Sequence, residues 1–146
     1  MLSHDFKLNK LALGLIAIAI TTAGSTALAA ADLYLSEYVE GSSNNKAVEI
    51  YNGSGAPIDL AAGGYALKMY FNATLTAGAT INLTGTVLPG ATFVGAHASA
   101  DASILAKTNQ AVGGSWYNGN DSVVLMKGAA VIDSIGKIGG NPATEW

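Results

Sequence analysis

The chain has 146 residues, of which 50% are hydrophobic and 12% charged, a balance that suits one small globular domain with its own core. It contains no cysteine, which excludes disulfides, a lipid-modified cysteine and the usual Cys/His zinc sites. The formal net charge is −3 and arginine is absent, so direct nucleic-acid binding by this chain is not expected, because phosphate-binding surfaces gather Lys and Arg. Low charge combined with 18 glycines favours a β-rich fold over a helical bundle.

The first 31 residues predict a cleaved signal-peptide helix. Lys7 and Lys10 form a positive start, residues 11–20 an apolar core, and residues 27–29 or 29–31 a small-residue cleavage pattern. The apolar core of about ten residues is shorter than the roughly 20 that span a bilayer, so no stable membrane span is expected; a permanent membrane helix is the minor alternative. We therefore expect a secreted or cell-surface protein, and the lack of disulfides favours a bacterial source.

A β-hairpin is predicted over residues 33–52. Two runs rich in aromatic and β-branched residues, 33–40 and 46–52, flank a cluster of Gly, Ser and Asn that is typical of a connecting loop. If Glu40 lies opposite Lys46, antiparallel counting gives the pairs Val39–Ala47, Tyr38–Val48, Glu37–Glu49 and Ser36–Ile50. Like charges directly opposite each other destabilise a sheet by up to roughly 1 kcal/mol. The Glu37–Glu49 pair therefore calls for a cation, a proton or open water.

Shorter elements follow this hairpin. Residues 58–60 form a short extended piece, and residues 98–107 contain the only helical turn that the sequence predicts. Apolar alternation or apolar runs predict further strands over 65–71, 80–84 and 92–96, and a second hairpin made of 122–127 and 129–136. About seven short strands separated by frequent turn signals predict an all-β, immunoglobulin-like antiparallel β-sandwich over residues 32–146.

Several of these segments together resemble the lamin-tail domain family. The resemblance rests on Leu-Ser-Glu-Tyr at 35–38, Lys-Ala-Val-Glu-Ile-Tyr-Asn-Gly at 46–53, Pro-Ile-Asp-Leu at 57–60, and the segments 119–125 and 131–136. That family has an immunoglobulin-like sandwich and occurs in nuclear lamins and in exported bacterial proteins. More narrowly, residues 36–47 are similar to the amino-terminal lamin-tail module of large secreted bacterial nucleases, whose catalytic domain lies further downstream.

The resemblance implies a non-catalytic module that binds or positions other molecules. Its partners would be a downstream domain of the same protein, or a protein or glycan at the cell surface. Family members continue beyond the equivalent of residues 141–146 into a final strand, so we expect this chain to lack its last strand and to be the leading fragment of a secreted nuclease. Two alternatives stay open: the function is DNA or RNA hydrolysis by an absent catalytic domain, or the chain is a stand-alone adhesin or matrix protein.

Glu37 and Glu49 are the candidate metal ligands. Ca²⁺ prefers several oxygen ligands, and Glu40 or Asp121 could complete such a set. In the alternative interpretation one carboxylate is solvated and the other accepts hydrogen bonds from backbone amides, hydroxyls or Lys68. No other cofactor is expected.

Trp116 and Tyr117 are the candidate binding residues. They lie in a glycine-rich loop and could form an aromatic platform for a sugar or peptide; the alternative is that they pack against the end of the sandwich. His97 has neither a Gly-x-Ser-x-Gly elbow nor a second histidine in the exported part of the chain. We therefore assign no catalytic residue and do not expect this chain to be an enzyme.

Overall fold

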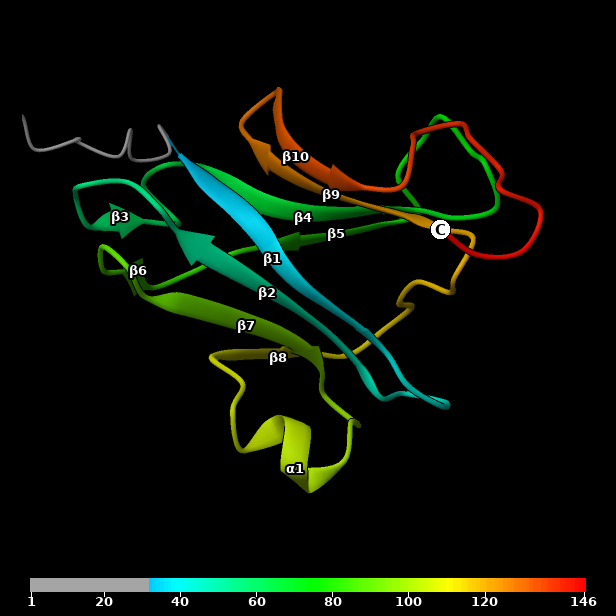
Figure 1. The fold of residues 1–146 in the computed structure, drawn as a ribbon, viewed down its shortest axis with the longest axis horizontal. Coiled ribbons are helices and arrows are strands. Elements are labelled where there is room, and N and C mark those ends of the chain that lie inside the picture. The colour runs from blue at the N-terminus through cyan, green and yellow to red at the C-terminus, as the bar shows by residue number, and fades with distance from the viewer. Residues whose placement is uncertain (1–31) are drawn as a thin grey trace, which may run out of the picture.

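The computed structural model describes residues 32–146, so the predicted signal peptide lies outside the described part of the chain. These residues form two facing β-sheets, with one short helix beside the first sheet (Figure 1). The elements are β1 (Leu33–Glu40), β2 (Lys46–Asn52), β3 (Ile58–Asp59), β4 (Tyr65–Tyr70), β5 (Ala79–Asn82), β6 (Thr86–Val87), β7 (Thr92–His97), α1 (Ala102–Leu105), β8 (Gln110–Val112), β9 (Ser122–Lys127) and β10 (Ala130–Ile135).

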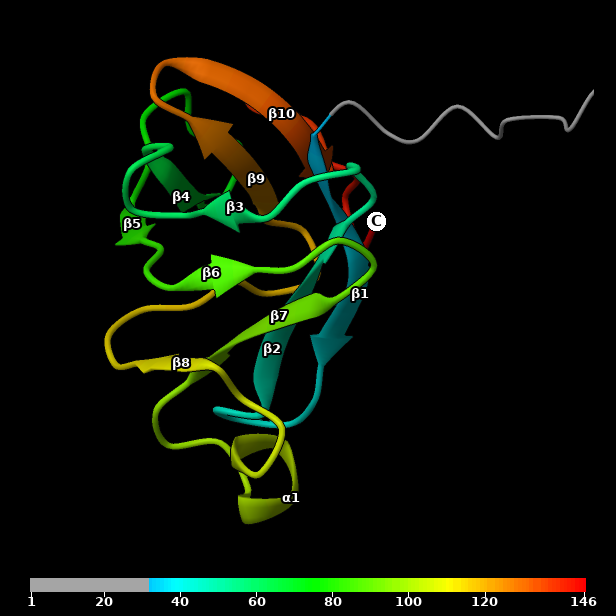
Figure 2. The same cartoon turned by 90° about the vertical axis from the view of Figure 1, so that its left-hand side faces the viewer.

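The strand order is β1-β2-β7-β8 in the first sheet and β10-β9-β4-β5 in the second, and β3 pairs separately with β6. All neighbouring strands are antiparallel except β7 and β8, which α1 connects in parallel. The β3–β6 ribbon lies at the left-hand end in Figure 1, and the second view, from that end, shows the two sheets facing each other with this ribbon between them (Figure 2). This arrangement confirms the predicted all-β sandwich.

Alternating apolar side chains form the core between the two sheets. Val48 and Ile50 from β2 and Phe93 from β7 face Leu67 from β4 and Leu125 from β9, and all five are buried. Strand geometry explains this burial, because side chains two residues apart point to the same side of a sheet. Burial of each such side chain contributes roughly 1.5–3 kcal/mol of transfer free energy. No helix in residues 32–146 is long and apolar enough to cross a membrane.

The predicted register of the first hairpin is confirmed from Glu40–Lys46 through Glu37–Glu49 and is wrong at Ser36. Leu35, not Ser36, pairs with Ile50, because a β-bulge inserts one extra residue between Leu35 and Glu37. The extra residue reverses the alternation, so Leu33 and Leu35 pack on the core although Glu37 points outward. The freed Leu35 N–H donates to the Asp133 carboxylate of β10 at 2.8 Å, which links the adjoining edges of the two sheets.

Three other segments differ from the sequence expectation. Strands β6 and β8 were not predicted, because two and three residues are too few to show alternation. The expected helical turn exists, but it is confined to Ala102–Leu105. In the described residues after Ile135 the chain forms turns without a further strand, and the Trp146 backbone N–H donates to the Gly119 carbonyl at 3.0 Å. The expectation of a missing last strand stays a prediction.

Candidate functional site

The loop between β1 and β2 is a tight turn that fixes the hairpin. The Gly41 N–H donates to the Asn45 carbonyl at 2.7 Å, and the Asn45 N–H donates to the Ser42 carbonyl at 3.1 Å. A side chain at Gly41 would place its Cβ 2.7 Å from the Asn45 Cβ, so the close approach of the two ends of this loop requires glycine. The hairpin is therefore a rigid element with two faces, one towards the second sheet and one towards solvent.

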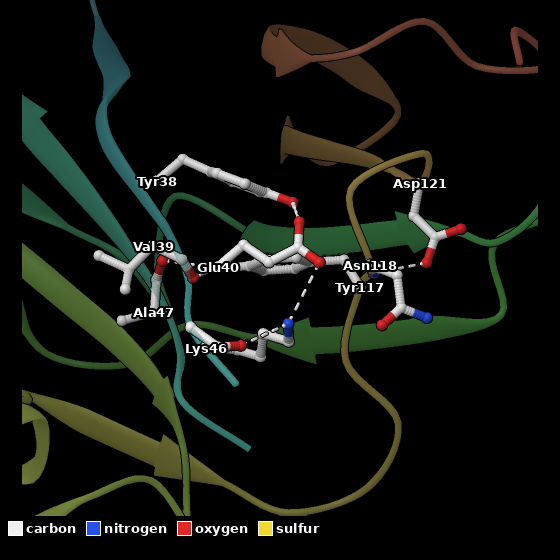
Figure 3. Close-up of polar contacts among 9 residues, drawn as sticks. Tyr38, Val39, Glu40, Lys46, Ala47, Tyr117, Asn118 and Asp121 are labelled. Carbon is white, nitrogen blue, oxygen red and sulfur yellow. Dashed lines mark hydrogen bonds and ion pairs between the residues drawn. The ribbon is translucent and has the colours of Figure 1, made fainter. Parts of the chain in front are cut away.

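The inner face carries an ion pair whose lysine is buried and whose carboxylate is partly exposed. Lys46 is 7% exposed, and its Nζ lies 3.2 Å from Glu40 Oε1 and donates to the Gly41 carbonyl at 2.9 Å. The Tyr38 hydroxyl donates to Glu40 Oε2 at 2.9 Å, so the carboxylate lies between a phenol and an ammonium group (Figure 3). Glu40 therefore stabilises the end of the hairpin and is not free to join Glu37 and Glu49.

Tyr117 lies directly behind this ion pair. Its hydroxyl lies 2.8 Å from the Val39 carbonyl oxygen and 2.7 Å from that of Ala47, so its single proton serves two strands, and its ring stacks on Tyr38 with centroids 4.5 Å apart. Burial raises the pKa of Tyr117, and burial together with the hydrogen bond to Glu40 raises the pKa of Tyr38. Both phenols therefore stay protonated and act as hydrogen-bond donors.

Asp121 organises the neighbouring loops. It is 2% exposed, and its two carboxylate oxygens accept hydrogen bonds from the backbone N–H groups of Asn72 at 2.8 Å and Asn118 at 2.7 Å. These bonds tie the β4–β5 loop to the segment before β9. The second residue that was expected to complete a metal site with Glu37 and Glu49 is thus also engaged elsewhere.

Glu37 and Glu49 face each other on the outer face of the hairpin. Glu37 is exposed and Glu49 half-buried, and Glu49 Oε1 accepts a hydrogen bond from the Ser36 hydroxyl at 2.7 Å. Lys68 is on β4 in the second sheet, so it is not the partner of this pair. Within residues 32–146 no group of three or more His, Cys, Asp or Glu residues could hold a metal ion. A Ca²⁺ site at Glu37 and Glu49 stays a prediction.

A groove of about 550 Å3 runs along this outer face. We call it the outer groove, and its lining residues are Glu37, Val39, Ala47, Glu49, Val94, Ser103, Ile104 and Lys107. The sheet supplies the floor, and α1 with the residues after it supplies one wall. Asn45 holds that wall in place, because its Nδ2 donates to Asp101 Oδ2 at 2.8 Å and its Oδ1 accepts from the Asp101 N–H at 2.8 Å. Asp101 is the residue directly before α1.

The two candidate binding aromatics are in different environments. Tyr117 has no exposed surface, so it belongs to the core and presents no face to a ligand. Trp116 is half-buried, donates from Nε1 to the Val112 carbonyl at 3.0 Å, and lines a shallow hollow of about 260 Å3. A two-ring surface platform is therefore not formed, and ligand binding by Trp116 stays a prediction.

His97 has a structural environment. Its Nδ1 accepts a hydrogen bond from the Ser99 N–H at 2.9 Å, which leaves Nε2 to donate to the Gly114 carbonyl at 3.2 Å. Both ring nitrogens are thus used to hold loops, and the ring meets Trp116 edge-on with centroids 6.1 Å apart.

Three contacts that shape the site were missed by sequence reasoning. They are the Asn45–Asp101 clamp, the Leu35–Asp133 hydrogen bond, and the cluster in which Asp32 bonds both the Tyr65 hydroxyl and Lys127 Nζ. Each joins residues more than 30 positions apart, and exposed Asp and Asn are common in loops, so no local signal marks them. Only the folded arrangement identifies the partners.

Residues 26–139 match the family model described as Lamin Tail Domain, a span that contains all ten strands and the whole outer groove. A search of curated proteins found no match.

Proposed function

Because the chain belongs to the lamin tail domain family, an immunoglobulin-like domain family, we propose that it is a non-catalytic binding and positioning module of an exported protein. This role is supported by a contrast around the hairpin between polar groups that form bonds within the fold and polar groups that line a groove. Glu40, Asp121 and His97 each hold loops or strands together, whereas Glu37 and Glu49 line an open groove. Rigid scaffolds with an open face suit binding.

Export and parentage are parts of the same proposal. The charged start, short apolar core and small-residue cleavage pattern of residues 1–31 support secretion. The similarity of residues 36–47 to the leading module of secreted bacterial nucleases supports a parent that hydrolyses extracellular DNA or RNA in a downstream domain. In that parent the present chain would position the catalytic domain, or hold the protein at the cell surface through a protein or glycan partner.

The decisive experiment is the intact mass of the native protein recovered from the culture medium of its source. A mass several times that of residues 32–146 supports a leading module of a larger secreted protein. A mass equal to residues 32–146 contradicts the nuclease parentage and favours a stand-alone surface or matrix protein. Retention of the protein in the cell with residues 1–31 attached contradicts export.

A second measurement tests the non-catalytic role directly. The purified full chain is incubated with supercoiled plasmid DNA and with RNA in the presence of Mg²⁺ or Ca²⁺. We expect no cleavage above a buffer control. Cleavage that co-purifies with the chain contradicts the proposal.

A further inference from the structure

We propose that the outer groove binds an extended polypeptide segment in which an arginine lies two residues away from an aliphatic side chain. This inference rests on the proposed binding role and names the partner chemistry. It is carried by three features of the groove: a pair of carboxylates that form no ion pair within residues 32–146, an apolar floor beside them, and a wall that is held in place by hydrogen bonds.

The carboxylate pair supplies the charge complementarity. Glu37 and Glu49 are cross-strand neighbours, and neither forms an ion pair within residues 32–146. Two carboxylates side by side repel each other, and a cation placed between them removes that repulsion. A guanidinium group is planar with five donors, so it can bond both carboxylates at once.

Aromatic rings adjoin the carboxylates on the same face. Tyr34 and Tyr51 pair across β1 and β2, and their ring centroids are 5.3 Å apart. Tyr51 lies two residues after Glu49, so both side chains point to the outer side of the sheet. Arginine combines ion pairing with stacking on aromatic faces better than lysine does.

The apolar floor sets the spacing of the ligand. Val39 lies two residues after Glu37 on β1, and it shares the groove with Val94 and Ile104. Side chains on one face of an extended segment repeat every two residues, about 6.4–6.8 Å apart. A segment that lies along β1 with arginine at Glu37 therefore places its next side chain on this face over Val39, where an aliphatic group fits.

The chain itself cannot supply this ligand to a second copy, because it contains no arginine. A free metal ion would use the carboxylates but not the apolar floor. A partner polypeptide uses both, and the Lys107 and Ser103 side chains at the rim can bond its backbone carbonyls.

The test is fluorescence anisotropy of the full chain with a labelled peptide of sequence Ser-Val-Ser-Arg-Ser-Val-Ser. We expect saturable binding that weakens as salt rises, and no binding of the same peptide with glutamate in place of arginine. Glu37→Gln and Glu49→Gln should each weaken binding roughly fivefold or more, and Ile104→Asp should weaken it as well. Glu145→Gln is the matched control, since it removes one exposed carboxylate outside the groove, and it should leave the affinity unchanged.

Several results would overturn the inference. These are failure of the folded chain to bind the arginine peptide, equal binding of the arginine and glutamate peptides, or equal affinity in Glu37→Gln and Glu145→Gln. Ca²⁺ binding that Glu37→Gln abolishes, without peptide binding, would replace the peptide with a metal ion. These results are separable from the proposed function, which the intact mass and the nuclease assay test independently. Circular dichroism of each variant confirms that the fold is retained.

Discussion

The two faces of the β1–β2 hairpin use their charges in opposite ways. On the inner face Glu40 is bonded to Lys46 and Tyr38, and the side chains of this group lie in or beside the core. On the outer face Glu37 and Glu49 lie next to each other, and within residues 32–146 the Ser36 hydroxyl is the one side-chain group that bonds either of them. Lys46 is the buried charge of this hairpin and must be paired to be tolerated, whereas the carboxylates that line the outer groove can stay without an ion pair and meet a ligand. Strand β1 therefore stabilises the fold through the side chains on its inner face, and the side chains on its outer face stay available to a ligand.

The largest expected effect is on the inner face, at Tyr117. Tyr117→Ala should lower the free energy of unfolding by about 3–5 kcal/mol, because it empties a fully buried ring position and removes the hydroxyl shared by Val39 and Ala47. Urea denaturation monitored by circular dichroism measures the loss. Tyr117→Phe is the control and should cost about 1–2 kcal/mol, since the ring stays and only the hydrogen bond is lost. A loss below 1 kcal/mol for Tyr117→Ala would place this ring outside the core.

Next in size is the Glu40–Lys46 ion pair, whose lysine is buried. Lys46→Met leaves the Glu40 carboxylate without its cation, and we expect a loss of about 2–3 kcal/mol in the free energy of unfolding, below the loss for a fully buried pair because the Glu40 side chain is 26% exposed. The double variant Lys46→Met/Glu40→Gln should recover part of this loss, because the unpaired charge is gone. A double-mutant cycle by urea denaturation measures the coupling. Additive losses would show that the two side chains do not act as a pair.

A third charged cluster tests the importance of burial. Asp32 accepts hydrogen bonds from Tyr65 and Lys127, and its side chain is about as exposed as that of Glu40, at 23% against 26%, but the Lys127 side chain is 45% exposed whereas that of Lys46 is 8% exposed. Solvent screens this cluster, so Asp32→Asn should cost no more than about 1 kcal/mol at neutral pH. Such a loss would be smaller than that of the inner pair, although both clusters contain a Lys–carboxylate bridge.

The pH dependence of this cluster follows from the pKa of Asp32. Partial burial would raise that pKa, but the hydrogen bonds from Tyr65, Lys127 and the Leu33 N–H together lower it below the ordinary value of 3.8. The unfolded chain then binds the proton more readily than the folded chain. The stabilisation is complete above pH 3.8 and is lost as the pH falls through the lower folded-state pKa. Thermal melts between pH 7 and 2 should show a steeper acid decline in the parent chain than in Asp32→Asn, and parallel declines would contradict this assignment.

Sequence reasoning recovered the parts of the fold that depend on local pattern. Alternation marked the long strands, and pairing Glu40 with Lys46 was enough to place Glu37 opposite Glu49. The bulge at Ser36 could not be predicted in the same way, because it depends on Asp133 in another strand. Counting residues outward from the turn therefore gives the register near the turn, and it fails further along β1, where Asp133 of the second sheet contacts the strand.

The candidate site was predictable in its charges but not in its shape. The facing carboxylates follow from register, whereas the wall of the outer groove depends on the clamp between Asn45 and Asp101. For Tyr117 the sequence offers only an aromatic in a glycine-rich loop, a pattern shared by surface platforms and by core residues. The fold packs this ring into the core and places its hydroxyl against the carbonyls of Val39 and Ala47.

The smallest expected effect is on the outer face, and its sign is opposite to that of the inner face. Glu37→Gln removes one of two facing like charges, so the free energy of unfolding should stay unchanged or rise by a few tenths of a kcal/mol, up to about 1 kcal/mol at low salt. The gain should shrink at high salt, because ions screen the repulsion in the parent chain. Urea denaturation at two salt concentrations measures this difference, with Glu145→Gln as the control for loss of a carboxylate elsewhere. A clear loss of stability in Glu37→Gln would mean that the carboxylate has a partner in the folded chain, and the outer face would then resemble the inner one. A gain would show that Glu37 is retained at a cost to the fold, as expected of a residue that serves binding.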